Sequence, residues 1–98
     1  MKIVAVADPE TALAFRLAGI ETVVLEKEEP IGIIKKIITD KEIGLVLITE
    51  RLAMRAGDKF KELINTVNLP LFIEIPDTRG PARKRMSNVE RMAAILRR

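Results

Sequence analysis

The sequence of 98 residues contains no cysteine and no histidine. Without cysteine it has no disulfide framework and no thiolate site for a metal ion. Without histidine it lacks the commonest general base and the commonest metal ligand. Trp and Tyr are also absent and only three Phe are present, which argues against a stacking platform for single-stranded nucleic acid. We therefore expect no catalytic residues, no cofactor and no bound metal.

Long apolar runs are absent as well, since none approaches the ~20 residues that a membrane-spanning helix needs. Met1 and Lys2 lead directly into a short strand-like run, which does not have the pattern of a signal peptide. The chain has 17 basic and 14 acidic residues, a net charge of +3 with both signs mixed, and this is weak evidence for nucleic-acid binding. The sequence predicts a cytoplasmic protein with no membrane insertion and no nucleic-acid partner.

Four short apolar runs recur along the chain, at residues 3–7, 22–25, 44–49 and 71–75. They are rich in β-branched residues, and three of them are nearly continuous rather than alternating. Continuous apolar strands are buried on both faces, as in a parallel sheet covered by helices. Helical patterns lie between the runs, which predicts βαβ units with right-handed crossovers.

The first helix is expected at residues 9–18. Asp8 is a suitable N-cap, Pro9 fits the first helical position and Gly19 is a natural stop. The helical spacing predicts an inner face made of Leu13, Ala14, Leu17 and Ala18.

Two further helices are expected, at residues 30–39 and 50–65. The second has Thr49 as its cap, and Gly57 weakens its middle by ~1 kcal/mol relative to Ala. The first carries an apolar stripe of Ile31, Ile34, Ile37 and Ile38. The second carries one of Leu52, Ala53, Ala56, Phe60, Leu63 and Ile64.

The composition changes after the fourth apolar run. Two Pro, one Gly and four basic residues follow within a short span, which predicts a linker. A capping box, Ser-Asn-Val-Glu, then begins a last amphipathic helix. We expect an α/β domain at residues 1–76, a basic flexible linker at 77–86 and a helix at 87–98. The predicted fold class is three-layer α/β, Rossmann-like or receiver-like, with a four-stranded parallel sheet and helices on both faces.

Asp8 is the acidic group at the carboxyl end of the first run, where α/β folds place their ligands. One interpretation is a catalytic or metal-binding carboxylate; the other, which the Asp-Pro pair favours, is a helix cap. A Gly-x-Gly-x-x-Gly phosphate loop is missing, because the corresponding span reads Ala-Asp-Pro-Glu-Thr-Ala. Asp8 and Glu10 would also repel a phosphate, so a dinucleotide site and a P-loop are not expected.

Two other function classes remain open at this point. A receiver-like signalling domain shares the predicted fold, but it needs a phosphorylatable Asp at the end of the third strand, where this chain reads Ile48-Thr49-Glu50. A small RNA-binding domain would use the basic residues between Arg79 and Arg85. We favour a solvated linker, or a docking strip for an acidic protein, for those basic residues.

Several side chains are candidates for contact with a protein partner. Phe15 lies outside the predicted inner face of the first helix. One interpretation of this position is an interface contact, because exposed aromatic residues are enriched at interfaces. The other is a position at the flank of the helix, covered by a loop. Glu74 lies in an apolar strand, which predicts a contact role or a salt bridge to Arg79 or a neighbouring Lys. The candidate contact residues are Phe15, Arg16, Glu74, Arg79, Arg83, Lys84, Arg85, Met92 and Ile95.

Three segments together resemble the F subunit of the archaeal and vacuolar-type rotary ATPases. The first is MKIVAVADPETALAFRLAGIE, in which the turn Ala7-Asp8 and the run Phe-Arg-Leu-Ala-Gly at 15–19 carry the similarity. The others are residues 43–53 and residues 69–76, the latter followed by a Gly-Pro loop. The resemblance covers most of the chain in the right order.

The resemblance implies a parallel α/β sheet, a mobile C-terminal helix and no catalytic activity of its own. It implies a central-stalk protein that binds the coiled-coil D subunit of the rotor and modulates ATP hydrolysis. Part of that role would come from the C-terminal helix reaching the subunits of the catalytic head. Such a protein is peripheral to the membrane through its complex, which moves protons or sodium ions. The chain departs from many relatives in ending at Leu96-Arg97-Arg98 without an apolar tail, and in a short segment between the second and third strands.

Overall fold

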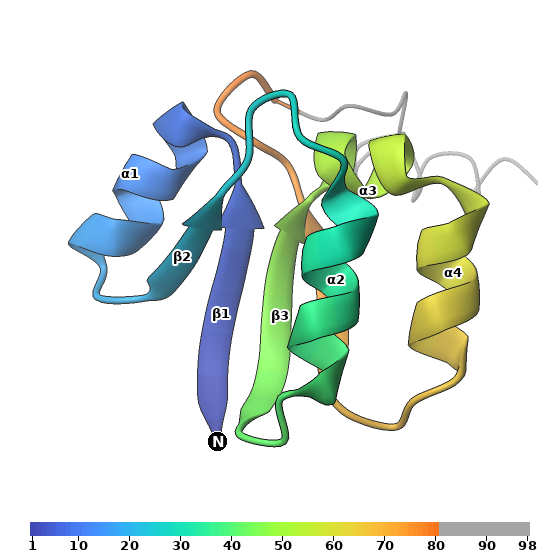
Figure 1. Cartoon of the computed structure of the whole chain (residues 1–98). Helices are drawn as coiled ribbons and strands as arrows, with labels where there is room; N and C mark the ends of the chain where they lie inside the picture. The colour runs from blue at the N-terminus through green and yellow to red at the C-terminus, as the bar shows by residue number, and fades with distance from the viewer. Residues whose placement is uncertain (81–98) are drawn as a thin grey trace, which may run out of the picture.

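The computed structural model describes residues 1–80, and the predicted helix at 87–98 lies outside them. One sheet of four parallel strands comprises β1 (Lys2–Ala7), β2 (Glu21–Val24), β3 (Ile43–Thr49) and β4 (Leu71–Ile75), in the spatial order β2-β1-β3-β4 (Figure 1). Each lies within one residue of its predicted position. The prediction of a parallel sheet is confirmed.

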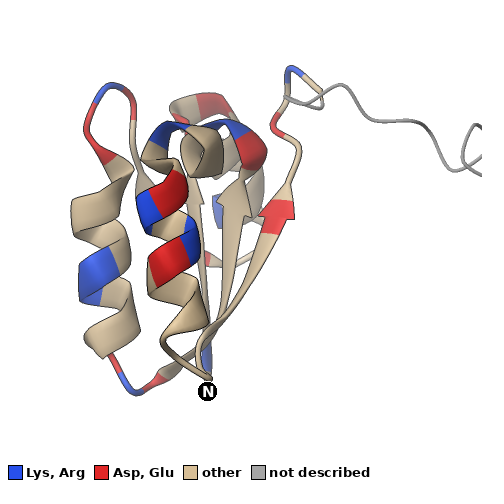
Figure 2. Cartoon of the chain, turned by 90° about the vertical axis from the view of Figure 1, so that its right-hand side faces the viewer, with Lys and Arg blue, Asp and Glu red and all other residues tan. Residues whose placement is uncertain are grey.

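The connecting helices are α1 (Pro9–Leu17), α2 (Pro30–Thr39), α3 (Glu50–Ala56) and α4 (Asp58–Asn65). From β1 the chain moves to one side to form β2 and then back past β1 to form β3. Because βαβ crossovers are right-handed, these opposite movements place α1 on one face of the sheet and α2 on the other. Helices α3 and α4 pack with α2, and Figure 2 shows α2 and α4 standing together on one side of the strands.

The main hydrophobic core lies between the sheet and helices α2, α3 and α4. Register places Val4 and Val6 of β1 beside Val46 and Ile48 of β3 on this face, and all four are buried. The helices add the buried side chains of Ile34, Ile37, Leu52, Ala53, Ala56 and Phe60. The Phe60 ring lies edge-on to Phe72 of β4, with ring centroids 5.5 Å apart. The predicted apolar stripes of these helices are confirmed except at Ile38, which is absent from the core, whereas Ile33 packs against it.

The predicted inner face of α1 is wrong. Leu13 and Leu17 are 61% and 81% exposed, whereas Thr11 and Ala12 are buried. The helix has two adjacent apolar stripes, and periodicity alone does not say which of them meets the sheet. In the folded chain α1 lies over β1 and β2. The side of the helix that carries the small residue Ala12 faces the sheet, and Leu13 and Leu17 face solvent.

The single helix predicted at residues 50–65 is also wrong, because it is two helices separated at Gly57. Gly57 has φ 66° and ψ −145°, a backbone conformation that is accessible almost only to glycine. The chain changes direction there, and this lets Ala53 and Ala56 of α3 and Phe60 of α4 all reach the same core. The predicted cap of α3 is confirmed, since Thr49 Oγ1 accepts a hydrogen bond from Leu52 N.

Replacement of Gly57 by Ala should destabilise the fold. The positive φ puts a β-carbon in a strained backbone conformation, which costs about 1–3 kcal/mol. The matched control is Gly32→Ala in α2, where an added β-carbon meets no atom within 4 Å and the gain in helix propensity stabilises by up to about 1 kcal/mol. Urea unfolding of both variants measures the difference, and an equal effect of the two substitutions would contradict this account of the α3–α4 break.

Candidate functional site

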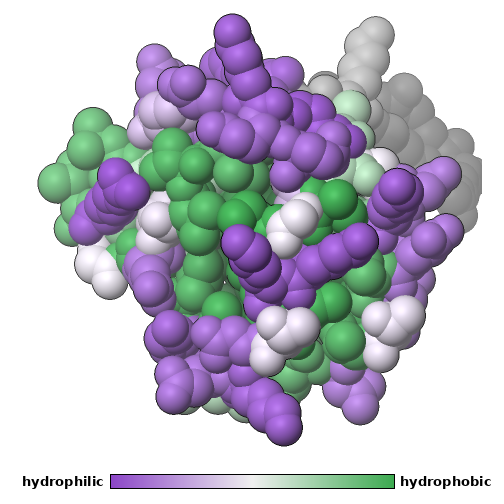
Figure 3. Space-filling model, viewed as in Figure 1, coloured by the Kyte–Doolittle hydropathy of each residue, from purple (hydrophilic) through white to green (hydrophobic). Residues whose placement is uncertain are grey.

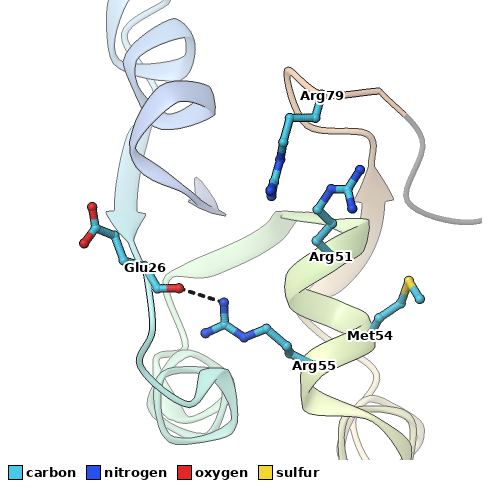
Figure 4. Close-up of a pocket in the computed structure, with 5 residues that line it drawn as sticks. All are labelled: Glu26, Arg51, Met54, Arg55 and Arg79. Carbon is cyan, nitrogen blue, oxygen red and sulfur yellow. Dashed lines mark hydrogen bonds between the residues drawn. The ribbon is translucent and has the colours of Figure 1, made fainter.

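The carboxyl ends of the strands form a charged rim, which is hydrophilic across the top of Figure 3. A hollow of about 530 Å³ lies there, lined by Glu26, Arg51, Met54, Arg55 and Arg79 (Figure 4). These residues come from three places: the loop after β2, helix α3 and the turn after β4. The position corresponds to the crevice outside the carboxyl ends of the strands, where α/β folds bind ligands.

The ion-pair centre of this rim is Asp77, whose side chain is only 1% exposed. Its Oδ2 lies 3.0 Å from Arg51 Nε and 3.1 Å from Arg79 Nη2. Its Oδ1 accepts a hydrogen bond of 2.9 Å from Arg79 N, and its carbonyl accepts one from Gly80 N. A buried carboxylate therefore fixes two arginines, one from α3 and one from its own turn.

The turn that contains Asp77 is also tied to α1. Thr78 N donates to Thr11 Oγ1 at 3.2 Å, and Thr78 Oγ1 donates to Glu10 Oε2 at 3.0 Å. Gly80 has φ 92°, which a residue without a β-carbon adopts at no steric cost. These contacts join the chain after β4 to helices on opposite faces of the sheet, to α1 through Thr78 and to α3 through Asp77.

Arg55 fastens the loop after β2 to α3. Its Nη1 donates to the carbonyl of Glu26 at 2.7 Å and its Nη2 donates to the carbonyl of Glu28. Figure 4 shows the Arg55 guanidinium reaching across to the Glu26 carbonyl, while the Glu26 carboxylate points away from the hollow. The pKa of Glu28 is lowered, chiefly by backbone N–H groups of Glu28 itself and of Glu26, with a smaller contribution from the charge of Arg55.

Asp8 is a helix cap, as the Asp-Pro pair predicts. Its Oδ2 accepts a hydrogen bond of 3.3 Å from Thr11 N, and α1 begins at Pro9. Burial raises the pKa of Asp8, but the hydrogen bonds from Thr11 and the charge of Arg79 outweigh it and hold the pKa below the ordinary 3.8. Within residues 1–80 no cluster of three acidic side chains is arranged to hold a metal ion.

The structure places the candidate contact residues in different environments. Phe15 is half-buried and Arg16 is exposed in the last turn of α1. Glu74 lies beside Ile48 in the sheet register and is half-buried, and the carboxylate that pairs with Arg79 is Asp77. Five candidates lie outside the described residues: Arg83, Lys84, Arg85, Met92 and Ile95.

An apolar surface occupies the face of the sheet opposite the main core. Ile3, Leu45 and Leu71 are register partners on three adjacent strands, and Leu47 and Ile73 form the next row. Leu71 is 60% exposed, and Ile73 and Ile3 are 48% and 47% exposed. In the described part of the chain α1 covers β1 and β2 on this side, and Figure 2 shows no helix over β4 there. We call these five residues the open half-face.

The outer side of α1 also exposes apolar side chains. Leu13 and Leu17 project from this helix, and Figure 3 shows apolar side chains over α1 at the left of the view. Contiguous exposed apolar patches on a folded protein mark sites of interaction. Sequence reasoning missed both this surface and the role of Asp77, because no local pattern shows which sheet residues remain uncovered or which turn reaches which helix.

The fold and its surfaces define a class: a small α/β domain with an ion-pair rim where related folds carry a phosphate loop, and with part of an apolar sheet face that no helix within residues 1–80 covers. Comparison with known proteins gives the family. Residues 3–93 match the family of the ATP synthase (F/14-kDa) subunit, and the chain belongs to it.

Named relatives agree with this assignment. The chain is 37% identical to the F subunit of the A-type ATP synthase of Pyrococcus abyssi, over 82% of this chain and 79% of that protein. It is 38% identical to the F subunit of Methanocaldococcus jannaschii, again over 82% of this chain and 79% of that protein. It is 36% identical to that of Thermococcus sibiricus over 100% of this chain and 92% of the relative. The resemblance stated from the sequence is confirmed. Within residues 1–80 no helix is long and apolar enough to cross a bilayer.

Substitution of Asp77 by Asn should weaken the fold. Asn keeps the shape but removes the buried negative charge that two arginines face, and we expect a loss of about 1–3 kcal/mol. Asp40→Asn is the matched control, because Asp40 Oδ1 accepts only from Glu42 N in an exposed turn and Asn retains an acceptor. Thermal unfolding should leave this control within about 0.5 kcal/mol of the parent. Equal stability of the Asp77→Asn variant and the parent would show that the ion pairs do not hold the turn.

The charge of Asp8 should make the cap of α1 depend on pH. A carboxylate whose pKa is depressed in the folded state stabilises above its unfolded pKa, and this contribution is lost as the pH falls below 3.8 toward the folded pKa. Asp8→Ala should cost about 1 kcal/mol at neutral pH, and the difference from the parent should shrink in acid. Asp8→Asn keeps a cap acceptor without titrating. If this control lost the same stability in acid as the parent, Asp8 would not be the responsible group.

Proposed function

We propose that the chain is the F subunit of an A-type rotary ATP synthase, where it binds the coiled-coil D subunit of the central stalk as a non-catalytic part of the rotor. Membership of the family of the ATP synthase (F/14-kDa) subunit supports the complex. The observation that supports binding is the open half-face, three of whose apolar side chains are 47–60% exposed on a well-packed sheet.

The chemistry of the open half-face suits a helical partner. An amphipathic helix presents an apolar stripe wide enough to cover two neighbouring strands. The strand β4 that carries Leu71 and Ile73 lies at the edge of the sheet, but Pro70 and Pro76 flank it and Glu74 lies within it. Prolines and charges at a sheet edge oppose the addition of another strand. A partner therefore gains more by lying across the face than by pairing with the edge.

The proposal includes the modulation of ATP hydrolysis by contact with the catalytic head. The basic residues at 83–85 and the apolar residues Met92 and Ile95 would supply that contact, and they lie outside the described part of the chain. The protein would be cytoplasmic and peripheral to the membrane through its complex. It would have no ATPase activity of its own, so turnover by the isolated chain at a rate typical of enzymes would overturn this part of the proposal.

Charged substitutions on the open half-face should weaken the complex. Leu71→Glu and Ile73→Glu place a carboxylate in the apolar contact, where burial of an unpaired charge is costly. We expect each to weaken binding to the purified coiled-coil protein of the same complex by at least about tenfold, measured by calorimetry and by co-elution in size exclusion. Both sites are about half exposed or more, so the variants should retain the fold.

Thr66→Glu is the control, because it adds the same charge at an exposed site after α4, on the opposite face of the sheet. Its affinity should stay within about twofold of the parent. Failure of the parent chain to co-elute with the coiled coil at micromolar concentration would refute the function. Normal binding by both half-face variants would refute only the surface.

A further inference from the structure

The arginine-lined hollow at the carboxyl edge carries an inference that goes beyond a role in the rotor stalk. We infer that it is a binding site for the phosphate group of a small molecule, held by Arg51, Arg55 and Arg79. Nothing in the proposed docking through the open half-face uses these residues, which lie at another end of the sheet.

The guanidinium groups of the hollow are held in place before any ligand arrives. Arg51 and Arg79 both contact the buried Oδ2 of Asp77, at 3.0 Å and 3.1 Å. Arg55 is fixed by two backbone carbonyls. A fixed guanidinium loses little rotamer freedom when it binds an anion, and its planar donors match the oxygens of phosphate. Each of these contacts occupies only some of the five N–H donors that a guanidinium has.

The residues that line the hollow carry three positive charges and one negative charge. Three arginines line it, and the acidic groups around them are Asp77, which lies beneath two of them, Glu26 in the lining, Glu28 near Arg55 and Asp8 near Arg79. Figure 4 shows the Glu26 carboxylate directed away from the hollow and the Arg79 guanidinium directed into it. An adjoining hollow shares Glu26 and Arg79 but is also lined by Asp8, Glu10 and Lys27. The acidic side of that second hollow repels anions, which confines the phosphate to the side of Arg51 and Arg55.

The place and the volume of the hollow also suit a small ligand. The site lies at the carboxyl ends of parallel strands, where α/β proteins bind ligands. Its volume of about 530 Å³ falls in the range typical of small-molecule sites. The start of α1 is unsuited to this purpose, because the Asp8 carboxylate accepts a hydrogen bond from Thr11 N and its negative charge repels a phosphate there. The phosphate would be bound by side-chain arginines rather than by a glycine-rich loop, which is why the sequence shows no phosphate-binding motif.

The test is a titration of the full chain with inorganic phosphate, pyrophosphate and ADP in separate experiments at constant ionic strength. The chain has no Trp or Tyr, so the readout is the NMR signal of the arginine Nε–H groups together with the melting temperature. We expect saturable shifts confined to Arg51, Arg55 and Arg79, with pyrophosphate binding more tightly than phosphate. Tighter binding of ADP than of pyrophosphate would identify a nucleotide as the source of the phosphate group; equal binding would identify a free phosphate.

Two variants and a control decide the assignment. Arg79→Gln and Arg55→Gln should each weaken pyrophosphate binding by about tenfold or more, since each removes charge-assisted hydrogen bonds. Lys36→Gln, on the exposed side of α2, lowers the net charge equally and should leave the affinity unchanged. Shifts that do not saturate, or a loss of affinity in the Lys36→Gln control equal to that in the arginine variants, would overturn the proposal. Neither result would bear on binding to the coiled coil, which the half-face variants test.

Discussion

Both faces of a parallel sheet are apolar and must be covered by other elements. In the described part of this chain, helices cover one face and about half of the other. Helices α2, α3 and α4 cover one face and bury Val6, Val46 and Ile48 fully. On the opposite face α1 covers only β1 and β2. Apolar side chains on β3, on β4 and at Ile3 of β1 are left partly in water, and this is the physical reason to expect a partner.

The turn after β4 connects helices on the two faces of the sheet. After β4 the turn at 77–80 contacts α1 through Thr78 and α3 through Asp77. A buried charge in this place is tolerable only because two arginines and the backbone N–H of Arg79 contact it. The same contacts hold Arg51 and Arg79 at the rim of a hollow, so one carboxylate both fixes the turn and arranges the proposed anion site.

The open half-face and the arginine-lined hollow differ in their chemistry. The open half-face is apolar and broad, which suits a helical partner, and the rim is cationic and concave, which suits a small anion. In folds of the Rossmann type a glycine-rich turn after β1 would hold a phosphate. Here Asp8 and Pro9 start α1 directly, and positive charge comes instead from α3 and from the turn after β4.

The sequence by itself determined the four strands, helix α2, the caps at Asp8 and Thr49 and the family, because these depend on local periodicity, capping chemistry and a pattern of matching segments. It did not decide which stripe of α1 faces inward, since Ala12 and Leu13 both belong to apolar stripes and only the sheet chooses between them. Nor did it show the break at Gly57, where packing against the core outweighs a continuous helical pattern. Asp77, Arg51 and Arg55 meet residues distant in the sequence, up to 29 positions away for the Arg55–Glu26 bond, so only the tertiary structure could bring this site together.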